Sequence, residues 1–339
     1  MAIVGAGPAG IAAVGKVLDE GFDPKTVAWI DPHFKVGDLG GKWSQVSGNT
    51  KIHRFDKFLR GSQSFNYDSL ENQFDLKNMD PHGTCTLNYV VEPLQAITEQ
   101  LRKKVVTIES SVSALQSKNG EWSIQLDGGS ALSKNVILAV GAEPKKLNYS
   151  KPNISLEDAL DQRKLASKVD TSDVVGVFGS SHSAVMSIQN LLDSKAKQVI
   201  NFYNKQLRYA VDKGDWILYD NTGLKGRTAE WAKSNIDGKL PDGLMRVNSR
   251  TENIEPYLEQ CTKVVYAVGF EPRSIQINGT SSTRYDDKTG IIAPGVFGCG
   301  FAFPERIVDR AGNEESNVGI YKFMRRLDSA FPVWMNSER

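Results

Sequence analysis

The chain has 339 residues, enough for about two domains of ordinary size. Its 41 lysines and arginines nearly balance its 40 aspartates and glutamates, so no overall field attracts it to nucleic acid or anionic lipid. The three cysteines, Cys85, Cys261 and Cys299, form no CxxC pair and have no ligand-like spacing with the four histidines. We therefore expect no disulfide framework, no metal site and no dithiol redox centre.

The hydropathy of the chain predicts a cytoplasmic protein. No apolar run approaches the roughly 18 residues that a membrane span requires. The first expected strand begins at Met1, which leaves no room for a secretory signal. We expect neither a membrane nor a nucleic acid as partner.

The first predicted unit is a strand, a glycine turn and a helix. The apolar run 1–4 precedes Gly5-Ala6-Gly7-Pro8-Ala9-Gly10, and a helical stretch follows at 11–18. In such a turn the glycines allow a tight turn, close approach to a pyrophosphate and close helix packing, and the helix N-terminus favours anions. A second strand, 26–30, ends where a carboxylate would bind a ribose hydroxyl. The predicted dinucleotide site comprises Gly5, Gly7, Pro8, Ala9, Gly10 and Asp31.

A glycine-rich, aromatic segment follows, from 37 to about 80, with no clear period. It is long for a loop, which favours contact with a ligand. A helix is expected at 93–101 and strands at 105–108, 111–115 and 122–126, before a buried strand, 135–140, that ends at Gly141. These strands form an insert that closes the first nucleotide fold.

The second predicted unit repeats the first. After a polar crossing segment, 142–173, the strand 174–178 leads into Gly179-Ser180-Ser181-His182-Ser183-Ala184 and a helix. The next strand, 198–203, is followed by Asn204, Lys205 and Arg208, where a carboxylate would indicate NAD. Neutral and cationic residues there suit the 2′-phosphate of NADP, and the alternative is a solvated surface loop.

The remaining elements mirror the first half. The strand 263–268 ends at Gly269 as the strand 135–140 ends at Gly141, which indicates two similarly built halves. A strand then leads to Gly300 and Phe301, and a helix is expected at 317–327. The sequence thus predicts an α/β protein with two Rossmann-like, three-layer dinucleotide-binding domains, and two nucleotides indicate a flavoenzyme.

Taken together, these motifs resemble the two-dinucleotide flavoprotein superfamily that includes flavin-containing monooxygenases, N-hydroxylating monooxygenases and thioredoxin-reductase-like enzymes. The resemblance covers nearly the whole chain. It implies an FAD-binding domain, 1–165 plus 285–339, with an NAD(P)H-binding domain, 166–284, inserted in it. The cofactor-binding residues that it implies in addition are Gly41, Lys42, Trp43, Gly141, Ser180, Ser181, His182, Ser183, Gly269, Gly300, Phe301, Asn317 and Val318.

The segment Gly41-Lys42-Trp43 followed by Gly48-Asn49-Thr50 resembles the GGxW stretch and downstream asparagine of flavin-containing monooxygenases. The resemblance implies that Asn49 lies beside the flavin, where an amide can both donate and accept hydrogen bonds. The alternative is that Asn49 merely turns the chain after Gly48. The chain departs from relatives at Ser181, where many have glycine, and at Phe301, where reductases have an aspartate.

The predicted function is an FAD-dependent, NADPH-using monooxygenase that acts through a flavin hydroperoxide on a small nucleophilic substrate. One alternative is an NAD(P)H-dependent flavin reductase that passes electrons to a quinone, dye or protein acceptor. Another is a non-catalytic nucleotide-binding protein. The sequence does not name the substrate, and it leaves the oligomeric state open, with a homodimer as one possibility. An exposed aromatic tail at 331–335 would be a plausible contact surface.

Overall fold

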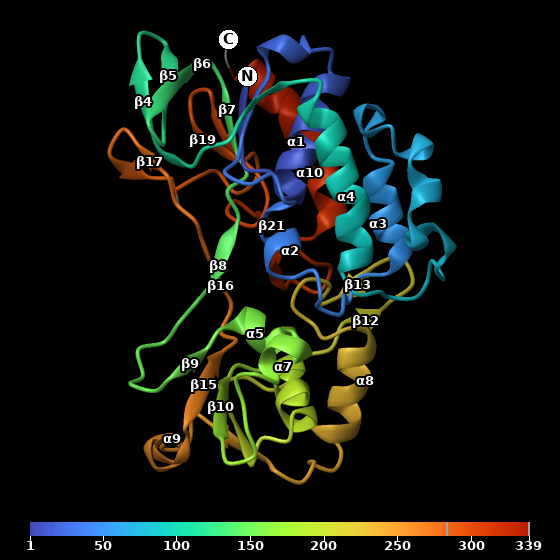
Figure 1. The fold of residues 1–339 in the computed structure, drawn as a ribbon, viewed down its shortest axis with the longest axis vertical. Coiled ribbons are helices and arrows are strands. Elements are labelled where there is room, and N and C mark those ends of the chain that lie inside the picture. The colour runs from blue at the N-terminus through green and yellow to red at the C-terminus, as the bar shows by residue number, and fades with distance from the viewer. Residues whose placement is uncertain (283, 338–339) are drawn as a thin grey trace.

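The computed structural model describes residues 1–282 and 284–337, which fold into two lobes (Figure 1). The first lobe contains a six-stranded sheet in the order β19-β20-β7-β1-β2-β3, parallel except at β19. Its strands are β1 (Ala2–Val4), β2 (Ala28–Ile30), β3 (Val106–Ile108), β7 (Val136–Leu138), β19 (Ile291–Ala293) and β20 (Val296–Gly298).

Side chains of β1 alternate between the two faces of this sheet, as the two-residue period of a strand requires. Ile3 packs with Trp29 in the core under the helices, whereas Val4 packs in the core under a second sheet. The helices on the first face are α1 (Pro8–Asp19), α4 (Asn88–Arg102) and α10 (Ile320–Asn336). The sheet on the other face consists of β18 (Thr280–Ser281), β17 (Gln276–Ile277), β4 (Val112–Lys118), β5 (Glu121–Leu126) and β6 (Gly129–Ser133).

The second lobe contains a parallel five-stranded sheet in the order β14-β11-β10-β15-β9. Its strands are β9 (Asn153–Ile154), β10 (Val174–Phe178), β11 (Gln198–Tyr203), β14 (Leu244–Asn248) and β15 (Lys263–Tyr266). The helices around it are α5 (Leu156–Leu160), α6 (Gln162–Leu165), α7 (His182–Asp193), α8 (Gly226–Asn235) and α9 (Glu255–Gln260). The expected α/β architecture with two three-layer nucleotide-binding domains is confirmed.

The chain crosses between the lobes twice, through β8 (Ala142–Pro144) and β16 (Phe270–Pro272), which pair antiparallel. Beyond the first crossing, β9 already pairs in the second lobe, and after the second crossing β17 pairs in the first. The expected boundaries at 165/166 and 284/285 therefore each fall inside a lobe. Within the polar segment 142–173, β8 is followed by the two-residue strand β9 and by the short helices α5 and α6.

The segment 37–80 is more ordered than the sequence indicated. It contains α2 (Gly37–Gly41) and α3 (Ile52–Leu59), and α3 buries Ile52, Phe55 and Phe58 on one face. The expectation of an irregular segment was wrong at α3, because a three-residue apolar spacing over eight residues is a weak helical signal. Four 3₁₀ turns follow, η2 (Gln63–Phe65), η3 (Tyr67–Ser69), η4 (Glu71–Gln73) and η5 (Asp75–Asn78), and an earlier one, η1 (Pro24–Thr26), precedes β2.

The C-terminal helix begins later and runs further than expected. Asn317 lies in β22 (Glu314–Asn317), which pairs with β21 (Glu305–Val308), and α10 then continues through Pro332. The aromatic rings of the tail are not exposed, although Val333 between them is: Phe331 is buried, and Trp334 is fully buried and stacks on Phe297 with ring centroids 4.9 Å apart. In the second half of the chain, β12 (Val211–Asp212) and β13 (Ile217–Leu218) form a small hairpin between β11 and α8. No helix within the described ranges is long and apolar enough to span a membrane.

Candidate functional site

The first glycine turn joins β1 to α1, and two of its glycines are required by the fold. Gly5 has a φ of +105°, and a Cβ there would lie 2.4 Å from the carbonyl oxygen of Ala139. A Cβ on Gly10 would lie 1.9 Å from the carbonyl oxygen of Gly5. At Gly7 a Cβ would meet only the Cα of Gly37, at an ordinary 3.9 Å. Gly7 is therefore not needed for packing, which fits a position that a ligand approaches closely.

Asp31, directly after β2, binds the glycine turn. Its carboxylate accepts hydrogen bonds from the backbone N–H groups of Ala6 at 2.7 Å, His33 at 2.8 Å and Phe34 at 2.7 Å. A carboxylate has about four lone-pair positions, so one remains for a ribose hydroxyl. Asp31 therefore fits the expected role and also fixes the loop around it.

Two distant segments meet the N-terminus of α1, whose first residues are Pro8 and Ala9. A Cβ on Gly300, which has a φ of +84°, would lie 2.7 Å from the Cβ of Ala9. A Cβ on Gly37 would lie 2.8 Å from the Cα of Gly7. The C-terminal motif and the start of the 37–43 segment thus converge on the first glycine turn, as a continuous dinucleotide site requires.

A line of aromatic rings runs along the boundary between the lobes. Trp43 lies 6.2 Å from Phe270, Phe270 lies 6.4 Å from Phe301, and Phe301 lies 6.1 Å from Phe323, between ring centroids. Phe270 and Phe301 are exposed, at 38% and 45%. Phe301, where reductases have an aspartate, is thus part of an apolar wall. Planar aromatic faces of this kind suit a flat ring system.

Polar residues border this wall. Lys42 lies 3.3 Å from Asp38, between Nζ and Oδ1, and Asp38 also pairs with Arg273 at 2.6 Å. Arg273 also donates to the carbonyl oxygen of Val140, beside Gly141, which has a φ of +74°. A Cβ added to Gly41 would meet nothing within 4 Å. The expected residues 41–43 and Gly141 therefore lie at one edge of the first site.

Asn49 lies between Ser47, which forms an isolated bridge with Thr86, and Lys51, the N-cap of α3. The preceding Gly48 is needed because a Cβ there would lie 2.9 Å from the carbonyl oxygen of Cys85. The Asn49 Oδ1 receives a long hydrogen bond of 3.5 Å from Thr50, and in the described part of the chain its Nδ2 has no partner. Gly48 and Asn49 lie outside any regular element and the chain bends at Thr50, so both roles expected for Asn49 stay predictions.

Asn317 offers a buried acceptor near the start of α10. Its Nδ2 donates to Glu305 at 2.7 Å, while its Oδ1 is buried with no partner among the described atoms. An unpaired buried acceptor is costly, so this oxygen fits a position that receives a hydrogen bond from a bound group. Val318 follows, then Gly319 with a φ of +148° at the N-cap of α10.

The second glycine turn repeats the first between β10 and α7. Gly179 has a φ of +128°, and a Cβ there would lie 2.3 Å from the carbonyl oxygen of Ala267, two residues before Gly269. Its own carbonyl oxygen accepts from the Nδ2 of Asn201 at 2.8 Å. Ser181 is the N-cap of α7 and is exposed, with Ser180 before it and Ser183 after His182. The turn therefore presents a helix N-terminus to solvent, as a phosphate site requires.

His182 is the first residue of α7. Its Nδ1 is buried and has no partner among the described atoms. Burial, with a smaller contribution from Lys225, lowers the pKa of His182 to about 4, so the ring is neutral near pH 7. It fits an uncharged border of the site and does not fit a permanent cation.

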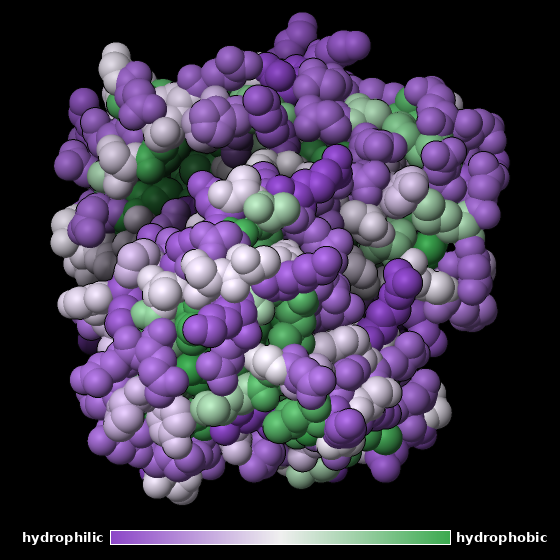
Figure 2. Space-filling model, turned by 60° about the horizontal axis from the view of Figure 1, so that its bottom comes forward, coloured by the Kyte–Doolittle hydropathy of each residue, from purple (hydrophilic) through white to green (hydrophobic). Residues whose placement is uncertain are grey.

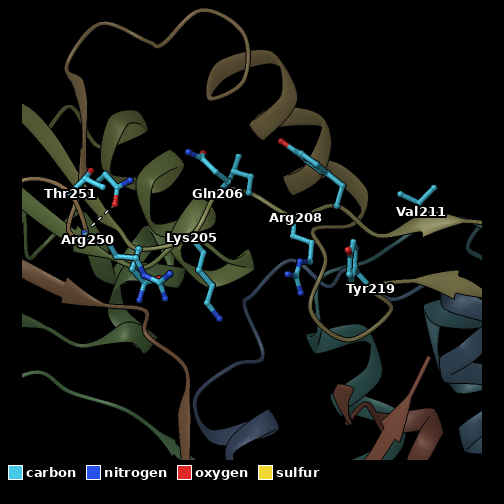
Figure 3. Close-up of a pocket in the computed structure, with 11 residues that line it drawn as sticks. Lys205, Gln206, Arg208, Val211, Tyr219, Arg250 and Thr251 are labelled. Carbon is cyan, nitrogen blue, oxygen red and sulfur yellow. Dashed lines mark hydrogen bonds between the residues drawn. The ribbon is translucent and has the colours of Figure 1, made fainter. Parts of the chain in front are cut away.

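A cavity of about 690 Å³ lies at the carboxyl ends of β11 and β14. It brings together the expected Asn204, Lys205 and Arg208 with residues that the sequence did not identify, Tyr219 and Arg250 among them. Figure 3 shows Lys205 and Arg250 reaching into the same space, with Arg208 beside Tyr219. The guanidinium of Arg208 lies 4.3 Å from the Tyr219 ring centroid.

The sequence gives only a partial signal for Arg250, because its place beside Lys205 depends on β14 pairing with β11. Arg250 follows the strand 244–248, and parallel strands bring their carboxyl ends to one edge of a sheet. The position that corresponds to Asp31 in the second lobe is Tyr203, with the guanidinium of Arg246 4.0 Å from its ring centroid. The second site thus has cations and aromatic rings where the first has a carboxylate.

Comparison with known proteins agrees with this architecture. No family model matches the chain. "Monooxygenase AgnR1" from Paecilomyces divaricatus is 29% identical over 386 aligned positions, which cover 98% of this chain and 97% of that protein.

Solved structures superpose over the full chain at low identity. An ornithine N-hydroxylase from Kutzneria sp. 744, with reduced FAD, NADP+ and L-ornithine, has a TM-score of 0.67 at 13% identity, covering 100% of this chain and 99% of that one. A thioredoxin reductase from Lactococcus lactis has a TM-score of 0.59 at 12% identity, covering 99% and 98%. The chain therefore has the fold of the two-dinucleotide flavoprotein superfamily, which includes both flavin monooxygenases and thioredoxin reductases.

Proposed function

We propose that this protein is an FAD-dependent, NADPH-using monooxygenase that acts on a small nucleophilic substrate. The observation that carries the proposal is the pair of similarly built dinucleotide sites, the second of which opens into a cationic cavity. Full-length similarity to a monooxygenase supports the reaction class.

The first lobe has the residues to hold FAD. The N-terminus of α1, with Gly7 open to a ligand, suits the diphosphate, and Asp31 suits a ribose hydroxyl. The unpartnered Oδ1 of Asn317 and the aromatic wall suit the ring end. The second lobe would hold NADPH, with its diphosphate at the N-terminus of α7 and its 2′-phosphate among Lys205, Arg208 and Arg250.

The flavin supplies the redox chemistry, because it accepts electrons from NADPH and activates dioxygen. The chain's own residues bind and orient the two cofactors and exclude water from the space between them. The exposed rings of Phe270 and Phe301 provide an apolar surface at the boundary between the lobes. Asn49 is proposed as the polar residue nearest the reacting atoms, since its amide nitrogen has no partner within the described structure.

The cysteines argue against thiol–disulfide chemistry. Cys85, Cys261 and Cys299 are all buried and unbridged, and burial raises the pKa of each thiol. A neutral buried thiol is a poor nucleophile. This separates the chain from dithiol reductases of the same fold, and it leaves a flavin reductase with an external acceptor as the rival function.

A redox assay with isotopic oxygen tests the proposal. The protein should purify yellow, lose its colour with NADPH without oxygen, and transfer one ¹⁸O atom from labelled dioxygen to an amine or sulfur compound. NADPH oxidation that gives only peroxide, with rapid turnover when a quinone is added, would favour the reductase. A protein that binds both nucleotides without bleaching would favour the non-catalytic alternative.

Asn49 needs a separate test because its role is inferred from its position. We expect Asn49→Ala to keep FAD and to uncouple NADPH oxidation from product formation. Thr50→Ala, which removes the neighbouring hydroxyl, is the matched control and should remain coupled. Equal coupling in both variants would remove Asn49 from the proposal.

The partner proposed here is a small molecule, and a homodimer stays a prediction. Figure 2 shows a face on which hydrophilic residues predominate and hydrophobic ones form small, separated patches. Light scattering at several protein concentrations would measure the oligomeric state.

A further inference from the structure

The segment that joins β13 to α8 belongs to the second lobe but contacts the first. Figure 1 shows the β12–β13 hairpin rising beside the lower ends of α3 and α10. The Oδ2 of Asp220 accepts a hydrogen bond from the Nζ of Lys322, at the start of α10, at 2.6 Å. The same Nζ donates to the Oδ1 of Asn221 at 2.6 Å. The contact therefore joins residues 102 positions apart and in different lobes.

Asp220 is surrounded by cations. Its other carboxylate oxygen lies 2.5 Å from the Nζ of Lys225 and 3.9 Å from the guanidinium of Arg54 in α3. Arg54 in turn donates to the hydroxyl of Tyr321. Although burial opposes it, hydrogen bonds from Lys225 and Lys322 lower the pKa of Asp220 to about 2. The carboxylate is therefore charged at every ordinary pH.

Burial makes the loss of either partner in this contact costly. The Lys322 side chain is only 6% exposed, and a buried charge that loses its partner is left without compensation. Asp220 thus compensates the charge of the buried Lys322. An exposed ion pair, by contrast, contributes little to stability.

A second buried carboxylate holds the next two residues. Glu315 in β22 is 4% exposed, and its Oε2 accepts from the backbone and side-chain nitrogens of Asn221, each at 3.1 Å. Its Oε1 accepts from the hydroxyl of Thr222 at 2.5 Å. Three consecutive residues, 220–222, are therefore all bound by the first lobe.

The residue before this segment faces the coenzyme cavity. Tyr219 lines that cavity, has a φ of +57°, and stacks with Arg208. A positive φ at a tyrosine is uncommon and persists only where the surroundings impose it. One short stretch of chain thus connects the cationic cavity to the first lobe, in addition to the chain crossings at β8 and β16 and the packing of Val46 into the core of the second lobe.

We propose that residues 220–222 form a latch that fixes the orientation of the NADPH-binding lobe on the FAD-binding lobe, and that Asp220 and Glu315 are positioning residues. Neither is proposed to touch the reacting atoms. The part that concerns hydride transfer rests on the proposed function, because the aligned groups would be the nicotinamide and the flavin. The part that concerns lobe orientation does not.

The test compares Asp220→Asn and Glu315→Gln, which preserve shape, with Asp215→Asn as a matched control. Asp215 pairs with Arg310 across the same boundary at 2.5 Å, but both side chains are more than half exposed. Three properties are measured on the holoenzyme: the rate of flavin reduction at saturating NADPH without oxygen, the apparent Kd for NADPH, and the solution shape by small-angle X-ray scattering.

We expect both latch variants to reduce flavin at least about tenfold more slowly than wild type, because small misalignments cost large factors in rate. Their apparent Kd for NADPH should stay within about twofold of wild type, since no cavity residue is changed. Their scattering should show a wider distribution of interatomic distances. Asp215→Asn should match wild type in all three measurements.

Wild-type reduction rates or wild-type scattering in the latch variants would overturn the proposal. Hydrogen exchange supplies the structural control: loss of protection throughout β10 and β11 would mean that the variants unfold the lobe, which also overturns a positioning role. If the wild-type protein takes up no flavin, the proposed function fails, and the scattering comparison alone then decides whether the latch exists.

Discussion

The two glycine turns have the same backbone and different side chains. In each, the first glycine faces a carbonyl oxygen that ends a neighbouring strand, Ala139 for Gly5 and Ala267 for Gly179. In each, the carbonyl oxygen of that glycine accepts from a buried side chain on the adjacent strand, Trp29 at 2.9 Å or Asn201 at 2.8 Å. The comparison teaches that the geometry of the turn is fixed by sterics, while its hydrogen bonds can be supplied by unrelated side chains.

The turns differ at the third position of the motif. Gly10 packs so closely that a Cβ would overlap the carbonyl oxygen of Gly5, whereas the second turn has a fully buried Ala184 at the equivalent place. The first helix can therefore approach its strand more closely than the second. The two sites also differ at the strand end, where Asp31 corresponds to Tyr203.

The largest effect should come from Gly10→Ala. A Cβ 1.9 Å from the backbone oxygen of Gly5 cannot be relieved by a side-chain rotation, so α1 must move. We expect a loss of more than about 3 kcal/mol in unfolding free energy and no retained flavin. Thermal unfolding and the absorbance of the purified protein measure both. A yellow variant with wild-type stability would show that the first turn is looser than the structure indicates.

The next effect should come from removing the cations of the second site. Arg250→Ala and Lys205→Ala should each weaken NADPH binding by about tenfold to a hundredfold, as expected for charged hydrogen bonds, and leave NADH binding nearly unchanged. The ratio of the two Kd values is the measurement. The control is Lys213→Ala, which removes an exposed lysine between β12 and β13. Equal losses for both coenzymes would place the 2′-phosphate elsewhere.

The sequence predicted what depends on local sterics and missed what depends on strand order. Gly5, Asp31 and Gly179 lie where expected because neighbouring residues fix a strand–turn–helix unit. Arg250 was missed because it joins Lys205 only when β14 pairs beside β11. The contact between Asp220 and Lys322 joins two lobes, and no short-range pattern could predict it.

His182 should make the second turn sensitive to pH, which Pro8 cannot do in the first. The unfolded side chain has a pKa of about 6.5, and burial lowers it to about 4 in the folded protein. Between these values the unfolded state binds the extra proton, so stability falls as the pH falls. His182→Gln should reduce the loss between pH 7 and pH 5 by about 2 kcal/mol. Denaturant titrations of the protein without coenzyme, at both pH values, measure this difference, and identical pH dependence in both proteins would contradict it.

The smallest effect should come from Ala184→Gly, the reverse of the first substitution. Glycine costs about 1 kcal/mol relative to alanine inside a helix, and the methyl group removed here is fully buried, so a modest further loss is expected. Flavin content should be unchanged, because the substitution lies in the second lobe, and the measurement is the thermal midpoint together with the NADPH affinity. A loss as large as that of Gly10→Ala would mean that Ala184 is as tightly constrained as Gly10, and that the two helices approach their strands equally closely. A small loss with retained NADPH binding would show that the third glycine of the motif is needed only where the helix packs very close to its strand. Dinucleotide binding itself would then not require it.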